Sequence, residues 1–343
     1  MRRLTLILSD LYLPSEDLPA AAGRGAGFAA INLPHLDWLL RVASVERIGD
    51  WRSWLSADLG RFDLTRMSLA QACARGSLPE PLSSNAWLAT PVQLEARIDH
   101  VRLADRGLLR LSADERETWR QEFARVFGPD YALHDAGERG FLLSGVSASR
   151  AASIDPARLL DADIGRALPS ATAGELRRLG TEIEMWLHGT PVNAARERRG
   201  EKRVSALWLW GGGGSESVPG LGTEPPSHPH LLGGDPFLSA LAGVAAVSTP
   251  VSFARLPVRA DRCIVELAPM SGRKDESLVE LESNWFGPAR DALNQGELMI
   301  DFIANDRWFR IAARPGWRFW RRRTSWLAQL SRQVPDAKPR LPL

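Results

Sequence analysis

The spacing of hydrophobic residues changes along this chain and separates short strands from amphipathic helices. The run Leu4–Leu8 is apolar and short, which predicts a buried β-strand. Apolar residues at intervals of three and four then predict a helix over Pro34–Val42. Further short helices are predicted at Asp50–Leu59 and Ser68–Ala74. A strand that leads into helices is typical of the start of an α/β domain.

The character of the chain changes over residues 85–200. Charged and apolar residues mix at Ala96–Leu103, which predicts an exposed strand. The segment Ser112–Glu115 has the spacing of a capping box and predicts the start of a helix. Tyr131–His134 and Arg139–Leu143 predict a hairpin. We therefore expect an inserted α+β cap in this part of the chain.

The α/β pattern resumes after the cap. Val204–Trp210 is apolar on both faces, which is typical of a central parallel strand covered by helices on both sides. Asp235, followed by proline, predicts a helix start, and Cys263–Leu267 predicts another buried strand. Leu298–Ala304 and Trp308–Ala312 predict a closing hairpin.

These elements predict an α/β fold with a mostly parallel sheet flanked by helices. We assign residues 1–84 and 201–316 to this core and residues 85–200 to the inserted α+β cap. Residues 317–343 form a basic, tryptophan-rich tail. Along Trp317–Leu330, tryptophans share one helical face with arginines beside it, so this segment predicts either a protein partner or docking on the body of the same chain.

Composition narrows the class of protein further. The chain has 343 residues, of which 44% are hydrophobic, enough for a substantial core. Lys and Arg number 43 against 41 Asp and Glu, a net charge of +2 that argues against nucleic acid as a partner. Two cysteines indicate a reducing compartment, and no apolar run approaches the length of a membrane span or a signal peptide. We therefore expect a cytoplasmic protein without a transmembrane segment.

The segment Thr181–Gly214 is the strongest candidate for a ligand site. Ligands of parallel sheets gather beyond the carboxyl ends of strands, and backbone amides in a glycine-rich loop can hold an anion. Arginine on a neighbouring helix can grip phosphate or carboxylate with two hydrogen bonds. On this basis the predicted ligand-binding residues are His188, Asn193, Arg196, Gly211, Gly212 and Gly213. A purely structural role for the same residues, in capping, turn formation and ion pairing, stays open.

Three motifs in this region give the chain a resemblance to a known family. They are Leu187-His-Gly-Thr-Pro-Val-Asn193, Arg196-Glu-Arg-Arg-Gly200 and Leu207-Trp-Leu-Trp-Gly211. Through them the chain resembles the RpfE-type regulatory protein family, a divergent relative of the archaeal-type cofactor-independent phosphoglycerate mutases of the alkaline phosphatase superfamily. The resemblance implies an alkaline-phosphatase-like core with an inserted cap.

The mutases use two divalent metals and a serine that becomes phosphorylated, so the resemblance must be tested at those positions. It implies Asp10 as a metal ligand and Ser53 as the nucleophile. The family's Asp-x-x-Gly-His element and its later Asp-His pair are missing, and no histidine follows His230. We therefore predict that the two-metal site is lost and that no cofactor is bound, with Mn or Mg needed only if catalysis persists.

Three functions follow as hypotheses. The first is a regulatory pseudoenzyme that binds a phosphorylated or carboxylated small metabolite or a protein partner. The second is an active but divergent metal-dependent phosphomutase or phosphohydrolase that uses Asp10 and Ser53. The third is a purely structural or interaction protein. The expected fold is shared by proteins of many different functions, so the fold alone does not decide between these three hypotheses.

Overall fold

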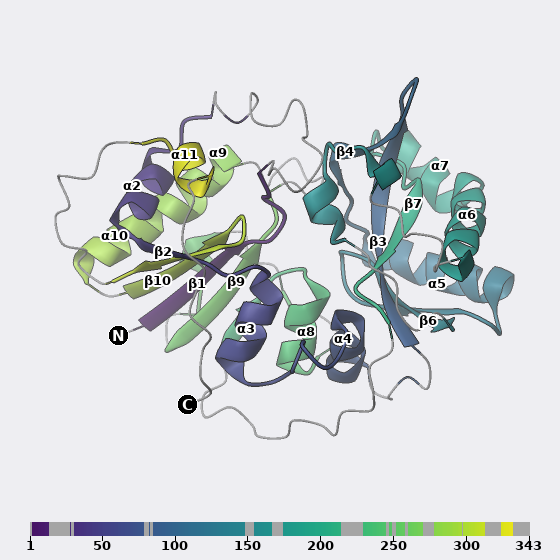
Figure 1. Cartoon of the computed structure of the whole chain (residues 1–343), viewed down its shortest axis with the longest axis horizontal. Helices are drawn as coiled ribbons and strands as arrows, with labels where there is room; N and C mark the ends of the chain where they lie inside the picture. The colour runs from purple at the N-terminus through teal and green to yellow at the C-terminus, as the bar shows by residue number, and fades with distance from the viewer. Residues whose placement is uncertain are drawn as a thin grey trace.

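The computed structural model describes most of the chain, with gaps between the described segments. These segments are residues 2–13, 28, 31–78, 82, 85–147, 154–166, 174–213, 229–244, 247–248, 252–257, 260–269, 278–296, 298–312 and 324–331. They form two sheets, each with its own helices (Figure 1). We call the first sheet with its helices the first domain, and the second sheet with its helices the second domain.

Among the described residues, the first sheet has six strands in the order β2-β11-β10-β1-β9-β8. Strand β1 pairs in parallel with both β10 and β9, and β8 extends the parallel part. Strand β11 is antiparallel to both of its neighbours. The strand bounds are β1 Arg2–Leu8, β2 Ser44–Arg47, β8 His230–Leu232, β9 Arg262–Leu267, β10 Leu298–Ala304 and β11 Arg307–Ile311.

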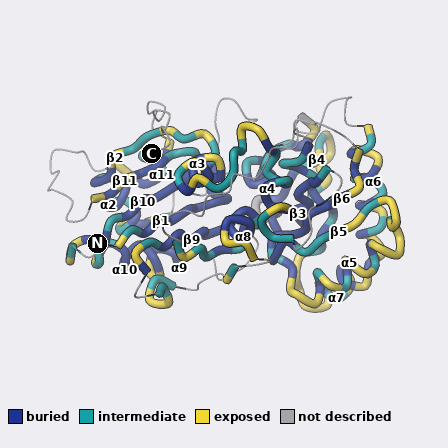
Figure 2. Tube along the Cα trace, turned by 90° about the horizontal axis from the view of Figure 1, so that it is seen from below, coloured by how far each residue is buried: buried dark blue, intermediate teal, exposed yellow. Residues whose placement is uncertain are grey.

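Helices cover both faces of this sheet because its strands are apolar on both sides. Leu4, Leu6 and Leu8 of β1 belong to one core with α2 (Pro34–Val42), α9 (Leu278–Leu281), α10 (Gly287–Gln295) and α11 (Trp326–Ser331). Ile7 points to the other core, with α3 (Trp51–Leu59), α4 (Leu69–Ser77) and α8 (Pro236–Ala242). A π-helical turn, Glu282–Phe286, joins α9 to α10. The first sheet is therefore the buried middle layer of the first domain (Figure 2).

The second sheet is antiparallel throughout. Its order is β4-β3-β6-β5, and β7 also pairs with β3. The strand bounds are β3 Asn85–Ala96, β4 Val101–Leu108, β5 Ala132–Asp135, β6 Phe141–Val146 and β7 Ala206–Trp210. One face packs on α5 (Ala113–Phe127), α6 (Gly174–His188) and α7 (Pro191–Arg198). Two short 3-10 helices, Pro156–Leu159 and Ile164–Arg166, follow β6.

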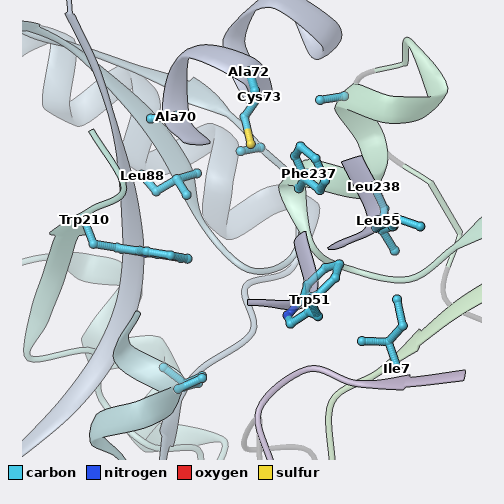
Figure 3. Close-up of a cluster of buried hydrophobic side chains, with 14 of the residues drawn as sticks. Ile7, Trp51, Leu55, Ala70, Ala72, Cys73, Leu88, Trp210, Phe237 and Leu238 are labelled. Atoms are coloured by element: carbon cyan, nitrogen blue, oxygen red, sulfur yellow. The ribbon is translucent and has the colours of Figure 1, made fainter. Parts of the chain in front are cut away.

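The other face of the second sheet packs against the first domain. Leu88 of β3 and Trp210 of β7 share one hydrophobic cluster with Ile7 of β1 and with Phe237 of α8. Figure 3 shows these side chains converging from both domains, with Trp51 of α3 between them. The apolar cluster therefore spans the contact between the two domains and stabilises it.

Several local predictions are confirmed. The helix over Pro34–Val42 has the expected bounds. Ser112 and Glu115 form the predicted capping box, and the predicted hairpin is β5 with β6. Asp235 caps α8 by accepting a hydrogen bond from the backbone N–H of Phe237. The α/β class, with a largely parallel sheet flanked by helices, is also confirmed.

Two strand predictions are wrong. Val204–Trp210 is not a central parallel strand, because β7 runs antiparallel to β3 in the second sheet. Its two apolar faces have a different cause: Leu207 packs on the helices of the second domain, whereas Trp208 packs toward the core shared with the first domain. Ala96–Leu103 is not one strand either, because the turn between β3 and β4 falls inside it.

The described part of the tail docks on the first domain. Trp326 is buried, packs edge-on against Phe28 with 5.8 Å between ring centroids, and donates a hydrogen bond to the carbonyl of Ile31 at 3.0 Å. Leu330 is fully buried. The predicted tryptophans at positions 317 and 320 lie outside the described residues. A helix both long and apolar enough to span a membrane is not found among the described residues.

Candidate functional site

Charged side chains gather at the carboxyl ends of β1 and β9, where the first domain faces the second. Ser9 and Asp10 follow β1 directly, and Glu266 lies near the end of β9. All three are at most 1% exposed. In open α/β sheets this edge is the usual place for ligands and chemistry. We therefore take this cluster as the candidate functional site, together with the buried Arg139 that contacts it and the buried Arg52 that lines the same small cavity as Arg139.

Arg139 enters this site from the loop between β5 and β6 of the second domain. Its Nη1 donates to Oε1 of Glu266 at 2.6 Å and to Oγ of Ser9 at 2.9 Å. The loop needs a glycine at position 140, where φ is +133° and a Cβ atom would lie 2.3 Å from the carbonyl oxygen of Ala89. Backbone geometry of the second domain therefore sets the position of this guanidinium.

Glu266 is the acceptor at the centre of the site. Besides Arg139, the hydroxyl of Ser9 and the backbone N–H of Gly234 donate to its carboxylate, the latter at 2.8 Å. Gly233 has φ of +149°, and a Cβ atom there would lie 2.6 Å from Cβ of Glu266. A glycine is thus required beside the carboxylate, and Arg139, Ser9 and the backbone of Gly234 all donate to the same side chain.

Arg52 of α3 forms the second half of the site. Its Nη2 donates to Asp235 at 2.6 Å, and its Nη1 donates to Asp155 of the second domain at 2.8 Å. The guanidinium also lies 4.5 Å from the ring centroid of Trp51 and 5.0 Å from that of Trp210. Two aromatic faces and two carboxylates therefore surround one buried cation.

The pKa of Asp235 reports this environment. Burial by itself favours the neutral acid, but the charge and hydrogen bonds of Arg52 outweigh burial and hold the pKa of Asp235 below its usual value. Burial likewise opposes the charge on Arg52, and Asp235 and Asp155 overcome it, so that the pKa of Arg52 is raised. The ion pair is therefore fully ionised near neutral pH.

The site carries a surplus of carboxyl groups and very little free space. Asp10, which acts electrostatically on Arg139, adds a fourth carboxyl to those of Asp155, Asp235 and Glu266, against two guanidiniums. The cavity between the domains leaves about 10 Å³ for the centre of a water molecule. That is room for roughly one water.

A second charge contact joins the domains beside this site. Arg158 of the second domain donates to both carboxylate oxygens of Asp306, each at 2.6 Å. Its guanidinium lies 4.2 Å from the ring centroid of Tyr12, and burial raises the pKa of that phenol. Asp155 and Arg158, three residues apart, thus contact the first domain with opposite charges.

Of the sequence-predicted residues, only Asp10 lies in this site. Ser53 follows Arg52 in α3, but its side chain is exposed whereas that of Arg52 is buried. The hydroxyl of Ser53 donates to Asp50 at 3.2 Å, and so does its backbone N–H, at 2.9 Å. Asp50 is the N-cap of α3, so these contacts stabilise a helix start.

Asn193 and Arg196 lie in α7 and are committed to contacts inside the second domain. Asn193 donates to the carbonyls of Leu187 and Val204, both at 2.8 Å, and accepts from the backbone N–H of Val204 at 2.9 Å. Arg196 donates to the carboxylate of Glu115 at 2.9 Å and to backbone carbonyls. These contacts fit the structural alternative, and a ligand-binding role for both residues stays a prediction.

His188 and the glycines make other contacts. His188 is exposed at the end of α6, where its carbonyl accepts from Arg203 at 3.0 Å. The carbonyl of Gly211 accepts from the backbone N–H of Ala70 in α4 at 2.8 Å. A Cβ atom on Gly212 would lie 2.3 Å from the ring of Trp87. Close packing therefore accounts for glycine at 212, and a ligand role for His188 and for Gly211–Gly213 stays a prediction.

Sequence reasoning missed Arg52, Arg139 and Glu266. Glu266 could have been found, because it is a charged residue inside an otherwise apolar strand. A buried charge needs a partner, so its position indicates a polar contact. Nothing in the sequence pointed to Arg139, since it lies in a hairpin turn, 127 residues from Glu266. Only the docking of the domains brings them together.

The residues of the site do not fit the two-metal centre that the family resemblance implies. Within the described segments, no three His, Cys, Asp or Glu side chains are grouped so that they could hold a metal ion. The carboxylates of Asp155, Asp235 and Glu266 accept hydrogen bonds from guanidiniums, which are donors and never metal ligands. The positive charge beside these carboxylates is thus supplied by arginine.

The chain is similar in arrangement to two solved structures. A cofactor-independent phosphoglycerate mutase from Thermoplasma acidophilum DSM 1728 is 15% identical, with 91% of this chain and 89% of that chain covered and a TM-score of 0.36. The PH0037 protein from Pyrococcus horikoshii is 13% identical, with 91% and 87% covered and a TM-score of 0.41. Neither a protein-family model nor a curated protein matches the sequence. The function must therefore be argued from the residues of this chain.

Proposed function

We propose that this chain is an RpfE-type regulatory protein, a phosphoglycerate-mutase-like scaffold that binds without catalysing phosphoryl transfer. The observation that carries this proposal is the engagement of both buried arginines with carboxylates: Arg52 with Asp235 at the start of α8, and Arg139 with Glu266 near the end of β9. Phosphoryl transfer needs a nucleophile that can be deprotonated and cations that neutralise the transferring group. Here the cations are tied to carboxylates of the same chain.

The hydroxyl groups near the site support the same proposal. Ser9 donates to Glu266 and accepts from Arg139, so its oxygen is held within an ion pair. Ser53 is exposed and bonded to the cap of α3. A nucleophile must be free to approach a bound substrate, and Ser9 does not meet that condition. Ser53 is accessible, but its hydrogen-bond partner is the cap residue Asp50.

A phosphorylated or carboxylated ligand is disfavoured in this cleft by charge. An anion must displace Asp155 or Asp235 from Arg52, or Glu266 from Arg139, in a cleft whose carboxyl groups already outnumber its guanidiniums. A protein partner is the remaining regulatory ligand. At the tail, such a partner is expected to contact residues other than Trp326 and Leu330, which are buried.

Activity and ligand assays on the purified full chain test this proposal. With Mn²⁺ present, we expect no interconversion of 3- and 2-phosphoglycerate and no hydrolysis of p-nitrophenyl phosphate. We also expect 3-phosphoglycerate to leave the thermal midpoint unchanged. Turnover that disappears in Ser53→Ala or Asp10→Asn would instead establish the divergent phosphotransferase. A thermal shift without turnover, removed by Arg196→Ala, would restore the predicted anion site in α7.

A further inference from the structure

We infer that a pocket at the amino ends of β1, β9 and β10 binds a small aliphatic carboxylate, with its hydrocarbon chain on the apolar lining and its carboxylate at Arg2. The pocket has a volume of about 240 Å³ and lies at the opposite ends of the strands from Ser9 and Glu266. Pockets for drug-sized ligands measure roughly 300–1,000 Å³, so this one suits a smaller molecule. Because the pocket is separate from the charged cluster, the inference does not depend on the proposed function.

Strand alternation and register place four residues of the pocket on one face of the first sheet. Side chains two residues apart on a strand share a face, so Arg2 and Leu4 of β1 lie on the same side. Leu298 of β10 is the register partner of Arg2, and Cys263 of β9 is the register partner of Leu4. All four residues line the pocket. One face of the sheet therefore presents a cation at its edge with a largely apolar surface behind it.

A segment that precedes β9 contributes further apolar residues to the pocket. Phe253 begins a 3-10 helix, Phe253–Arg255, and packs together with Leu256 against the same hydrophobic core as Leu4. Apart from two arginines and a thiol, the lining is apolar, with Leu4, Phe253, Leu256, Pro257, Ala260 and Leu298 among its residues. A hydrocarbon chain in this pocket loses contact with water, which favours its binding.

Arg2 is the cation that a bound carboxylate can reach. Arg3 also lines the pocket, but its Nε donates to Asp301 at 2.5 Å and its Nη2 lies 4.0 Å from Asp58. The exposed side chain of Arg2 has no ion pair or hydrogen bond with any described residue. Burial raises the pKa of the Cys263 thiol and the charge of Arg2 opposes this rise, so the guanidinium is close to the pocket interior. An anionic group on the ligand gives this guanidinium a partner.

Isothermal titration of the full chain with octanoate, octan-1-ol and acetate tests the inference. Octanoate has both the hydrocarbon chain and the charge, whereas octan-1-ol has only the chain and acetate only the charge. We expect octanoate to bind about threefold to fivefold more tightly than octan-1-ol, the effect of one partly exposed ion pair. Acetate should bind more than about a hundredfold more weakly than octanoate, since it lacks the methylene groups that the pocket buries.

Two variants locate the ligand, and a third serves as the matched control. Arg2→Gln should abolish the preference for octanoate over octan-1-ol and leave the affinity for octan-1-ol unchanged. Ala254 lines the pocket at an exposed position, so Ala254→Trp should weaken both ligands at least about tenfold by filling the space of the hydrocarbon chain. Arg255 is exposed in the same 3-10 helix but does not line the pocket, and Arg255→Gln should titrate like the wild type.

A wild-type chain that does not bind octanoate, or that binds octan-1-ol equally well, would overturn the inference. So would a preference for octanoate that survives in Arg2→Gln, or an affinity unchanged in Ala254→Trp. Both substituted side chains are exposed, and circular dichroism establishes that each variant is folded. Failure of these titrations leaves the proposed function untouched, because its assays use 3-phosphoglycerate and p-nitrophenyl phosphate.

Discussion

Replacing Arg52 with methionine is expected to produce a large, pH-dependent loss of stability. Methionine keeps much of the apolar stem but removes the guanidinium from between Trp51 and Trp210. Asp235, at 3% exposure, and the mostly buried Asp155 then lose their counter-charge. The variant tests whether the ion pairs of Arg52 contribute to the free energy of unfolding.

The expected loss in the free energy of unfolding is about 3–5 kcal/mol. This is the usual cost of removing one partner of a buried ion pair, because the other charge stays buried without compensation. Most of the loss should come from the two stranded carboxylates. Since whole proteins are stable by about 5–15 kcal/mol, the variant should remain folded but unfold at clearly lower urea concentration.

The pH dependence separates this mechanism from simple loss of packing. In the wild type the pKa of Asp235 is lowered, so its contribution is complete above the ordinary carboxyl pKa and is lost as pH falls through the depressed value. In the variant, burial dominates and the pKa of Asp235 is raised above its ordinary value. Protonation then relieves the cost, so the stability gap between the two proteins should narrow from pH 7 toward pH 4.

Urea denaturation followed by tryptophan fluorescence measures the gap at each pH. Arg66→Met is the matched control, because Arg66 pairs with Asp63 on the surface and is 72% exposed, and little change is expected there. Arg52→Met/Asp235→Asn should recover part of the loss, since asparagine is neutral and can still cap α8. A loss under about 1 kcal/mol, or a gap that stays constant between pH 7 and pH 4, would refute the reasoning.

Three further substitutions have distinct expected results. Gly233→Ala places a Cβ atom against Glu266 and should lower the thermal midpoint clearly more than Gly60→Ala, where φ is also positive but the space is open. Asn193→Ala removes three hydrogen bonds to buried backbone and should cost roughly 2–4 kcal/mol by urea denaturation. Ser53→Ala removes one exposed hydrogen bond to Asp50 and should lower the urea midpoint only slightly, and a marked loss would contradict its surface assignment.

Local structure was predictable where the signal lies within a few residues. The capping box at Ser112 needs only the side chain of Glu115, three residues further on. The closing hairpin turns at Asn305 and Asp306, which both have positive φ, a conformation that these residue types tolerate. Such elements are specified by their own sequence, so a single chain is enough to place them.

Pairing between distant segments was not predictable in the same way. An apolar strand such as Ala206–Trp210 can be buried in either sheet. Its own sequence does not specify which strand it pairs with, here β3. The charged site has the same limitation, because Arg139 and Glu266 approach only after two domains fold and dock. The sequence motifs led to Asn193 and Arg196, whose contacts are within the second domain, and not to the cleft.

The position of β1 in the first sheet has a consequence for how the chain folds during synthesis. This strand leaves the ribosome well before both of its neighbours, β9 and β10, which come from residues 262–304 (Figure 1). At about 5–20 residues per second, roughly 15–60 s pass before both edges of β1 can be paired. The strands that the structure describes in the second sheet all emerge in that interval. The second domain is therefore able to form while both edges of β1 are still unpaired. An apolar strand with unpaired edges promotes aggregation, so the nascent chain needs protection during this interval.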